Sequence, residues 1–184
     1  LSAVARVFER IIYNQLSNYF EDNKFLTKYQ SGFRKVHSTV TSMLKTTNDW
    51  LLNMDKGHYT GVVFFDLKKA FDTVDHGILL SKLSAYGVKD IELKWFHSYL
   101  SDRKQCCYLN GVRSSMREIK VGIPQGSCLG PLLFLIYIND LPLVLKHSTP
   151  SIFADHTNIS TSSCKIADLQ IQHAEDIDCV IRWM

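Results

Sequence analysis

The stretch that decides the fold is Ser151–Thr157, SIFADHT, in which a short apolar run ends at an aspartate followed by a histidine. The residues around this pair predict a short hairpin with strands at 152–155 and 157–161. Taken alone, an Asp-His pair in a polar turn is a weak signal, because such turns are usually solvated loops. Its meaning depends on two blocks that come earlier in the chain.

The first block is Val62–Asp72, VVFFDLKKAFD, an apolar strand pattern that reaches an acid at Asp66. The second is Gly122–Pro131, GIPQGSCLGP, a loop rich in glycine and proline that leads into an apolar helix pattern. Acids at the ends of separate strands can become neighbours in an antiparallel sheet, and gathered carboxylates hold divalent ions. The pattern therefore predicts that Asp66 and Asp155 lie side by side. The competing interpretation is that Asp66 only ends a strand.

Composition limits the kinds of protein that this chain can be. With 184 residues, 46% hydrophobic and 21% charged, it can bury a core and is expected to form one globular unit. A net charge of +3 permits nucleic-acid binding without arguing for it. The five cysteines form no C-x-x-C pair, so neither a zinc knuckle nor a disulfide partner is expected. The longest apolar run, residues 132–138, is too short to span a membrane, so no membrane partner is expected.

Hydrophobic periodicity and punctuation residues give an expected element order. Ser38 and Asp75 are good helix N-caps, Gly57 and Gly87 are helix stops, and Asn110-Gly111 is a hairpin signal. The predicted helices are 2–20, 38–57, 75–86, 90–100, 132–145 with an interruption near Pro142, and 166–183; the predicted strands are 59–66, 105–109 and 116–121, besides the hairpin at 152–161. Such an order indicates an α+β domain whose antiparallel strands carry the acids and whose helices pack on the opposite face.

The three blocks, in this order, resemble the palm of a reverse transcriptase of the non-LTR (LINE-like) retrotransposons, and the likeness runs over nearly the whole chain. The resemblance implies an α+β fold with a polymerase palm-like antiparallel sheet packed on helices and part of the fingers. It assigns about 1–57 to the fingers side and about 58–184 to the palm. The basic fingers segment that would precede this stretch, and the thumb that would follow it, are not in the sequence, so we expect a partial domain.

The resemblance also implies an activity. Members of the family are RNA-directed DNA polymerases that extend a DNA primer on an RNA template. They use deoxynucleoside triphosphates as substrates and two Mg²⁺ (or Mn²⁺) ions as cofactors. An intracellular location, in the nucleus, the cytoplasm or both, is expected with it. The alternative is a noncatalytic RNA-binding or interaction module derived from such an enzyme.

The family likeness assigns metal-binding roles around the acids. Asp66 matches the first catalytic acid, the backbone carbonyl of Leu67 a further metal ligand, and Asp155 the first acid of the catalytic turn. His156 stands where the family has a second acid. Since Mg²⁺ prefers oxygen ligands and a negative charge is lost, we expect this copy to be inactive. The competing interpretation of His156 is a partly exposed turn residue.

Nucleotide contacts are assigned to two further places. Phe71 matches an aromatic steric gate beneath the sugar, with core packing as the competing interpretation. Gln125 and Gly126 lie in the loop that approaches the nucleotide and the template, where an ordinary Gly/Pro turn is the alternative. Asp72 and Asp75 are expected to serve as turn and helix-cap residues, and not as metal ligands.

The stretch Tyr29–Thr39, YQSGFRKVHST, resembles the fingers block of these enzymes. In that block Arg34 and Lys35 are expected to meet phosphates of the nucleic acid. A solvated surface turn is the competing interpretation, because two basic residues are common on any surface.

Overall fold

The computed structural model describes residues 3–184. The chain forms two compact units by its internal contacts. The helical unit consists of the residues up to Phe25 together with Lys69–Tyr137, and the sheet unit consists of Leu26–Lys68 together with Ile138–Met184. This grouping does not follow the expected boundary near residue 57, and the division into fingers and palm stays a prediction.

The sheet unit is built on a three-stranded antiparallel sheet in the order β1-β7-β6. Strand β1 is Tyr59–Asp66, β6 is Thr149–Phe153 and β7 is His156–Ser163. The register pairs Asp66 with His156 across β1 and β7. On the other side of β7, the same histidine pairs with Phe153. The predicted strand at 59–66 and the presence of the hairpin are thereby confirmed. The predicted hairpin strands, 152–155 and 157–161, are shifted, because the first strand ends at Phe153 and the turn consists of Ala154 and Asp155.

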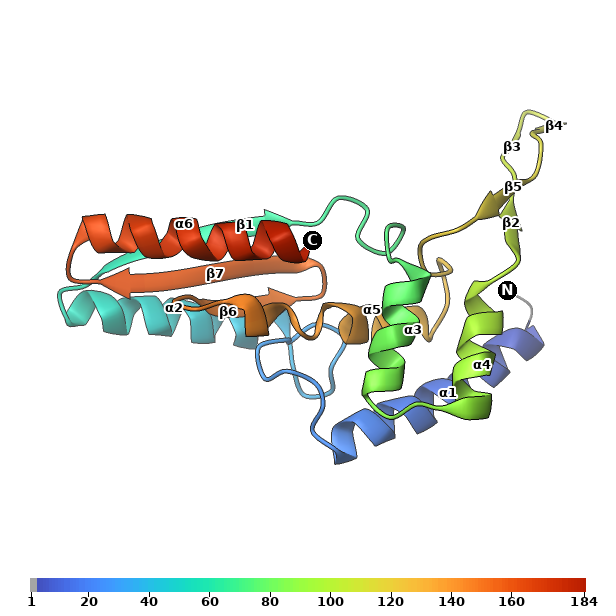
Figure 1. The fold of residues 1–184 in the computed structure, drawn as a ribbon, viewed down its shortest axis with the longest axis horizontal. Coiled ribbons are helices and arrows are strands. Elements are labelled where there is room, and N and C mark those ends of the chain that lie inside the picture. Colours follow the sequence, from blue (N-terminus) through green and yellow to red (C-terminus); the bar gives the residue numbers. More distant parts are fainter. Residues whose placement is uncertain (1–2) are drawn as a thin grey trace. The chain divides into compact units, whose positions relative to one another are not determined.

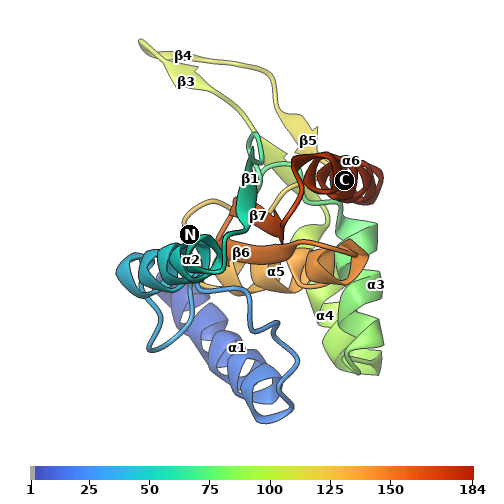
Figure 2. The ribbon, with the colours of Figure 1, turned by 90° about the vertical axis from the view of Figure 1, so that its left-hand side faces the viewer.

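Two helices cover the faces of this sheet, α2 (Thr39–Asp55) on one face and α6 (Ile166–Trp183) on the other (Figures 1 and 2). Helix α6 packs so closely on β1 that a Cβ at Gly61 would overlap the ring of His173. Helix α2 approaches β6 through hydroxyl contacts from Ser42 and Thr46 to Ser151, at 3.4 and 3.1 Å. Helices therefore cover both faces, whereas the sequence pattern predicts only one covered face.

Local capping signals set the helix starts that the sequence predicts. Ser38 accepts a hydrogen bond from the Thr41 backbone nitrogen at 3.1 Å and completes a capping box for α2. Asp75 accepts one from the backbone nitrogen of Ile78 at 2.9 Å and starts α3 (His76–Ala85). Both predicted caps are confirmed.

The helical unit combines α3 with α1 (Ala3–Asp22), α4 (Asp90–Leu100) and α5 (Gly130–Ile138), whose last residue belongs to the sheet unit. Its core residues come from all four helices and the segments between them: Leu16, Phe20, Ala70, Val74, Leu79, Leu83, Val88, Phe96, Leu100, Ile123, Leu129, Leu132, Leu133, Phe134, Leu135 and Ile136. The first half of α1 differs from the apolar stripe expected there. Val4 and Val7 are 80% and 63% exposed, whereas Glu9 is buried.

Two predicted elements are divided in the structure. The hairpin around Asn110-Gly111 consists of two separate ladders, β2 (Arg103–Gln105) with β5 (Arg117–Ile119) and β3 (Tyr108–Leu109) with β4 (Val112–Arg113). The predicted helix at 132–145 ends at Ile138, and the 3₁₀ helix η1 (Leu141–Val144) follows. Pro142 at the start of η1 explains the break, because its ring cannot continue the α-helical hydrogen bonding. No helix within residues 3–184 is both long and apolar enough to cross a membrane.

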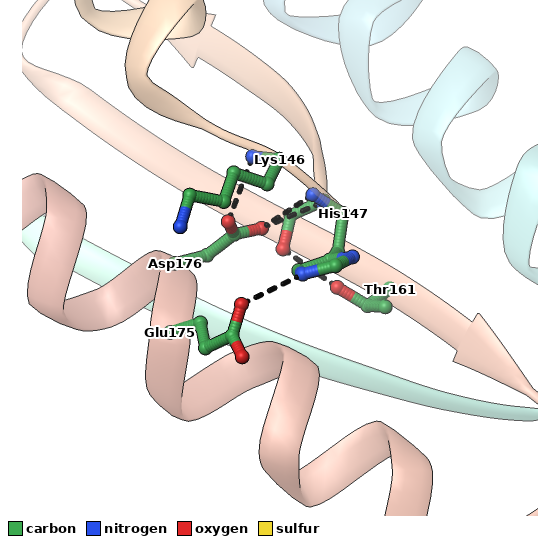
Figure 3. A network of polar contacts seen from close by, with 6 residues as sticks. Lys146, His147, Thr161, Glu175 and Asp176 are labelled. Atoms are coloured by element: carbon green, nitrogen blue, oxygen red, sulfur yellow. Dashed lines mark hydrogen bonds and ion pairs between the residues drawn. The ribbon is translucent and has the colours of Figure 1, made fainter.

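A buried carboxylate fixes the loop that enters β6 (Figure 3). Asp176 of α6 is fully buried and accepts hydrogen bonds from the backbone nitrogens of Lys146, His147 and Ser148 at 2.8, 3.1 and 2.7 Å. The carboxylate of the neighbouring Glu175 lies 3.0 Å from His147 Nε2, within hydrogen-bond distance. Burial alone would raise the pKa of Asp176, but a hydrogen bond from the Ser148 side chain and the three backbone hydrogen bonds outweigh burial and hold the pKa below its usual range.

Candidate functional site: an acid cluster and a motif loop

The acid cluster consists of Asp66, Asp155 and His156 at one end of the sheet. Asp66 is the last residue of β1, Asp155 is the second turn residue, and His156 is the first residue of β7. One ligand atom from each side chain lies within 4.8 Å of the others. The structure therefore brings together the two acids that the sequence pairs, although their roles as metal ligands stay a prediction.

The acid cluster is exposed to solvent. The side chains of Asp66 and His156 are 83% and 71% exposed, and Asp66 Oδ1 lies 3.5 Å from His156 Nδ1. In this exposed setting such a pair adds little to folding stability, so the arrangement has no evident structural purpose.

The donor set fits a divalent ion in kind but departs from what Mg²⁺ prefers. Two carboxylates within reach of one another are suitable oxygen ligands for Mg²⁺ or Mn²⁺. The imidazole of His156 suits zinc, copper or iron better than magnesium. Asp66 and Asp155 are therefore the residues that would hold an ion here, and His156 is the member of the cluster that weakens the fit.

A groove of about 600 Å³ borders the cluster inside the sheet unit. It lies between α2 and the sheet, and Asp66 and His156 form part of its lining. Its remaining walls include four aromatic residues, Trp50, Phe64, Phe65 and Phe153. Phe64 is 72% exposed, so its ring is accessible to a planar ligand.

Sequence reasoning missed the residue that holds the turn itself. Gln30 is 1% exposed and makes hydrogen bonds with both the backbone nitrogen and the backbone oxygen of Ala154. Its only sequence signal was its place in the fingers-like block, because its partner lies 124 positions away.

The motif loop, Gly122–Gly130, belongs to the helical unit and is pinned to the segment after Phe71. The backbone nitrogens of Gly122 and Ile123 donate to the carbonyls of Val74 and Phe71, both at 2.8 Å. Gly122 has φ +90°, and a Cβ there would lie 2.7 Å from the carbonyl oxygen of Asp72. Only glycine allows this close approach without strain.

Within this unit, Phe71 and Gln125 each have a partner. The Phe71 ring stacks on Phe134 with centroids 4.6 Å apart. The Gln125 amide donates to the carboxylate of Asp72 at 2.9 Å, while Gly126 is exposed and in the left-handed region at φ +76°. The expected closeness of Phe71 and Gly126 to the acid cluster stays a prediction, as do the nucleotide contacts of Gln125 and Gly126.

A second residue that sequence reasoning missed is Glu9 of α1, which is 3% exposed. Its carboxylate accepts hydrogen bonds from the Tyr99 hydroxyl at 3.0 Å, and from the Ser127 hydroxyl and the Cys128 backbone nitrogen at 3.1 Å each. Ser127 in turn accepts from the backbone nitrogens of Leu129 and Gly130 at the start of α5. One carboxylate thus anchors the second half of the motif loop.

The two basic candidates of the fingers-like block differ in their surroundings. Arg34 donates from one guanidinium nitrogen to the carbonyls of Thr27 and Gln30, at 2.9 and 3.3 Å. Lys35 is exposed. These contacts favour a structural role for Arg34, and the phosphate contacts of both residues stay a prediction.

Comparisons with known proteins identify the family. The model of the family "Reverse transcriptase (RNA-dependent DNA polymerase)" matches residues 1–184. The chain is 36% identical over 77% of its length to a probable RNA-directed DNA polymerase from transposon BS of Drosophila melanogaster, and covers 16% of that protein. It is 30% identical over its whole length to the RNA-directed DNA polymerase from mobile element jockey of Drosophila funebris, and covers 21% of it.

A solved structure supports the fold. The structure of apo telomerase from Candida tropicalis, truncated from its C-terminal domain, superposes with a TM-score of 0.61 at 16% identity. The match covers 92% of this chain and 36% of the telomerase chain. The predicted palm-like α+β fold is thereby confirmed. The chain spans between a sixth and about a fifth of the length of the retrotransposon relatives named above. By the family match over residues 1–184 and by these relatives, the chain belongs to the reverse transcriptase family, in its non-LTR, LINE-like branch.

Proposed function

We propose that this chain is the palm-centred part of an RNA-directed DNA polymerase of a LINE-like retrotransposon. The observation that supports this most is the approach of Asp66 and Asp155 at one end of an antiparallel sheet, with ligand atoms of the cluster within 4.8 Å of one another. In such a polymerase, two bound divalent ions stabilise the attacking and the leaving oxygen together. Asp66, Asp155 and the backbone carbonyl of Leu67 would hold those ions in this chain. The protein would act in the nucleus, the cytoplasm or both.

The motif loop and Phe71 would handle the incoming deoxynucleotide. Phe71 presents a flat ring supported by Phe134, which suits a steric gate against a 2′-hydroxyl. Gln125 and Gly126 are both exposed, so they are accessible to a nucleotide and a template. Arg34 and Lys35 would meet the phosphates of the template or the primer.

We further propose that this copy does not polymerise. His156 replaces an oxygen ligand with an imidazole and removes one negative charge from an open site. Phosphoryl transfer depends on electrostatic stabilisation by the ions and on positioning of the reactants. A cluster with one carboxylate fewer is therefore expected to hold the ions too weakly for catalysis.

A noncatalytic RNA-binding role is the second candidate, and the groove beside α2 favours it. Bases stack on aromatic side chains with about 1 to 3 kcal/mol each. Phe64 is exposed at 72% and lines the same groove as Trp50 and Phe153. A single-stranded RNA segment could stack there even if the acid cluster holds no ion.

The test is primer extension on an RNA template with Mg²⁺ or Mn²⁺. Residues 1–184 replace the matching segment of a complete jockey-type polymerase, either as they stand or with His156→Asp. We expect extension only from the His156→Asp version, and none from the unmodified chain alone. Equal activity of the two complete versions would contradict the inactivity. No activity from either version, beside an active parent polymerase, would count against the polymerase assignment.

RNA binding is tested separately on the unmodified chain by fluorescence anisotropy with a labelled single-stranded RNA. Phe64→Ala should weaken binding about fivefold or more, because one stacking surface is lost. Tyr59→Ala is the matched control, since Tyr59 is an exposed aromatic residue at the other end of β1. Equal binding by both variants would remove support for the groove.

A further inference from the structure

Gln30 lies in the segment between α1 and α2 and behaves as a neighbour of strand β6. The backbone nitrogen of Ile152 donates to the carbonyl of Tyr29 at 3.0 Å, and that of Ser31 donates to the carbonyl of Ile152 at 2.8 Å. These bonds form a parallel bridge between Gln30 and Ile152. Residues 29–31 thus pair with the edge strand β6 through one short parallel bridge.

The side chain of Gln30 extends this pairing to the turn. Its Oε1 accepts from the backbone nitrogens of Gly32 at 2.7 Å and Ala154 at 3.0 Å, and its Nε2 donates to the carbonyl of Ala154 at 3.3 Å. Two donors converge on one oxygen, which fixes the orientation of the amide. All three bonds are buried, so their loss would leave polar backbone groups unpaired.

The turn needs such support because Ala154 is in a strained conformation. Its φ is +57°, in the left-handed region, where a residue with a Cβ is strained. Ala154 directly precedes Asp155, so its backbone angles decide where the Asp155 carboxylate points. Without a partner that fixes both backbone groups of Ala154, the turn would be expected to relax.

Gly32 provides a second, independent sign that the turn is held from this side. A Cβ at Gly32 would overlap the backbone nitrogen and Cα of Ala154. The segment 29–32 therefore packs on the turn with no room for a side chain. Gly32 also donates to the same amide oxygen that accepts from Ala154.

The chemistry of an amide suits this position. It supplies a donor and an acceptor to one residue, which neither a hydroxyl nor a carboxylate does with the same geometry. It also adds no charge next to Asp155 and Asp66, whose carboxylates already repel each other in the absence of an ion.

We propose that Gln30 is a positioning residue of the acid cluster: it holds Ala154 so that Asp155 is aimed at Asp66 and the two can share a divalent ion. This inference rests on the proposed function of the cluster as a metal site. The Gln30 side chain makes its hydrogen bonds with Gly32 and Ala154, so it would act through the turn.

The first test is Mn²⁺ binding, measured by electron paramagnetic resonance on the His156→Asp chain. Gln30→Met keeps the length of the side chain and removes its donor and acceptors. We expect it to weaken Mn²⁺ binding about tenfold or more, as is typical for residues that orient metal ligands. Gln170→Met, at an exposed position of α6, is the matched control and should bind as the parent does.

Asp66→Asn separates failure of this inference from failure of the proposed function. If Asp66→Asn abolishes binding and folded Gln30→Met binds like the parent, the positioning role is wrong and the metal site stands. If Asp66→Asn changes nothing, the cluster is not the Mn²⁺ site, and both proposals fail.

The second test needs no substitution, so it decides the matter even if Gln30→Met does not fold. Amide hydrogen exchange is followed for Ala154 in the unmodified chain. Its nitrogen has Gln30 Oε1 as its acceptor, and we expect protection comparable to that of the β7 amides. Exchange at the rate of an open loop would overturn the proposal.

Discussion

Gln30 in the sheet unit and Glu9 in the helical unit perform the same task with different chemistry. Each is almost fully buried, at 1% and 3% exposure, and each holds a loop that carries candidate functional residues. Gln30 uses a neutral amide and bonds to backbone groups. Glu9 uses a charged carboxylate and takes two of its bonds from side-chain hydroxyls.

The difference follows from what each loop carries. The turn beside Gln30 holds Asp155, so a second buried carboxylate there would repel the acid cluster. The motif loop beside Glu9 carries Ser127 and Cys128, whose hydroxyl and amide are donors that stabilise a negative charge. A carboxylate is therefore tolerated in one place and an amide is required in the other.

The largest effect is expected from Glu9→Ala. The Tyr99 and Ser127 hydroxyls and the Cys128 amide would lose a buried acceptor, which should lower the free energy of unfolding by about 3 to 5 kcal/mol. Urea denaturation measures this loss. Glu21→Ala, an exposed glutamate of the same helix, is the control and should change little. A loss below about 1 kcal/mol would show that the carboxylate is not the anchor.

Asp176 is a third buried holder of a loop, and its carboxylate accepts hydrogen bonds from three backbone nitrogens and from the Ser148 side chain. Asp176→Asn keeps one acceptor and should cost about 2 to 3 kcal/mol of stability near neutral pH. The folded-state pKa of Asp176 is lowered, so its contribution is complete above the unfolded pKa of about 3.9 and is lost as pH falls through the folded pKa. Urea midpoints measured from pH 7 down to acid should therefore converge for the two proteins. A gap that stays constant with pH would contradict this role.

Tyr99→Phe removes a single donor to Glu9 and should cost about 1.5 kcal/mol. Burial, followed by the charge of Glu9, raises the pKa of Tyr99 well above its ordinary value, so the hydroxyl stays a donor at any working pH. The loss should therefore be the same at pH 7 and pH 9 in denaturation experiments. A loss that depends on pH in this range would show that the hydroxyl ionises.

The smallest effect on stability is expected from Asp66→Asn. The Asp66 side chain is 83% exposed and lies 3.5 Å from His156, so the free energy of unfolding should change by no more than about 0.5 kcal/mol. A loss above about 1 kcal/mol would mean that Asp66 serves the fold, contrary to its proposed use for an ion.

The fold was largely predictable because its signals are local. Ser38 and Asp75 cap the helices that they were predicted to cap. Strand β1 and helix α6 have the predicted bounds, 59–66 and 166–183. The approach of Asp66 and Asp155 followed from two apolar runs that both end on an acid.

Gln30 and Glu9, the buried residues that fix the two loops, could not be predicted in the same way, because their partners are distant in sequence. Gln30 meets Ala154 across 124 positions, and Glu9 meets Ser127 across 118. One signal for Glu9 was present: it lies seven and eleven positions before Leu16 and Phe20, on the helix face that is buried. A lone charge on a buried face indicates a polar partner, but the sequence does not say which one.

The measurement that tests the central claim most directly is Mg²⁺ binding to the folded chain, by isothermal titration calorimetry, with histidine or aspartate at position 156. We expect the His156→Asp chain to bind Mg²⁺ about tenfold or more tightly than the unmodified chain, because the substitution restores an oxygen ligand and a negative charge beside Asp66 and Asp155. The unmodified chain should prefer Zn²⁺ to Mg²⁺. Equal Mg²⁺ affinity of the two proteins would contradict the claim that His156 disables an inherited polymerase metal site.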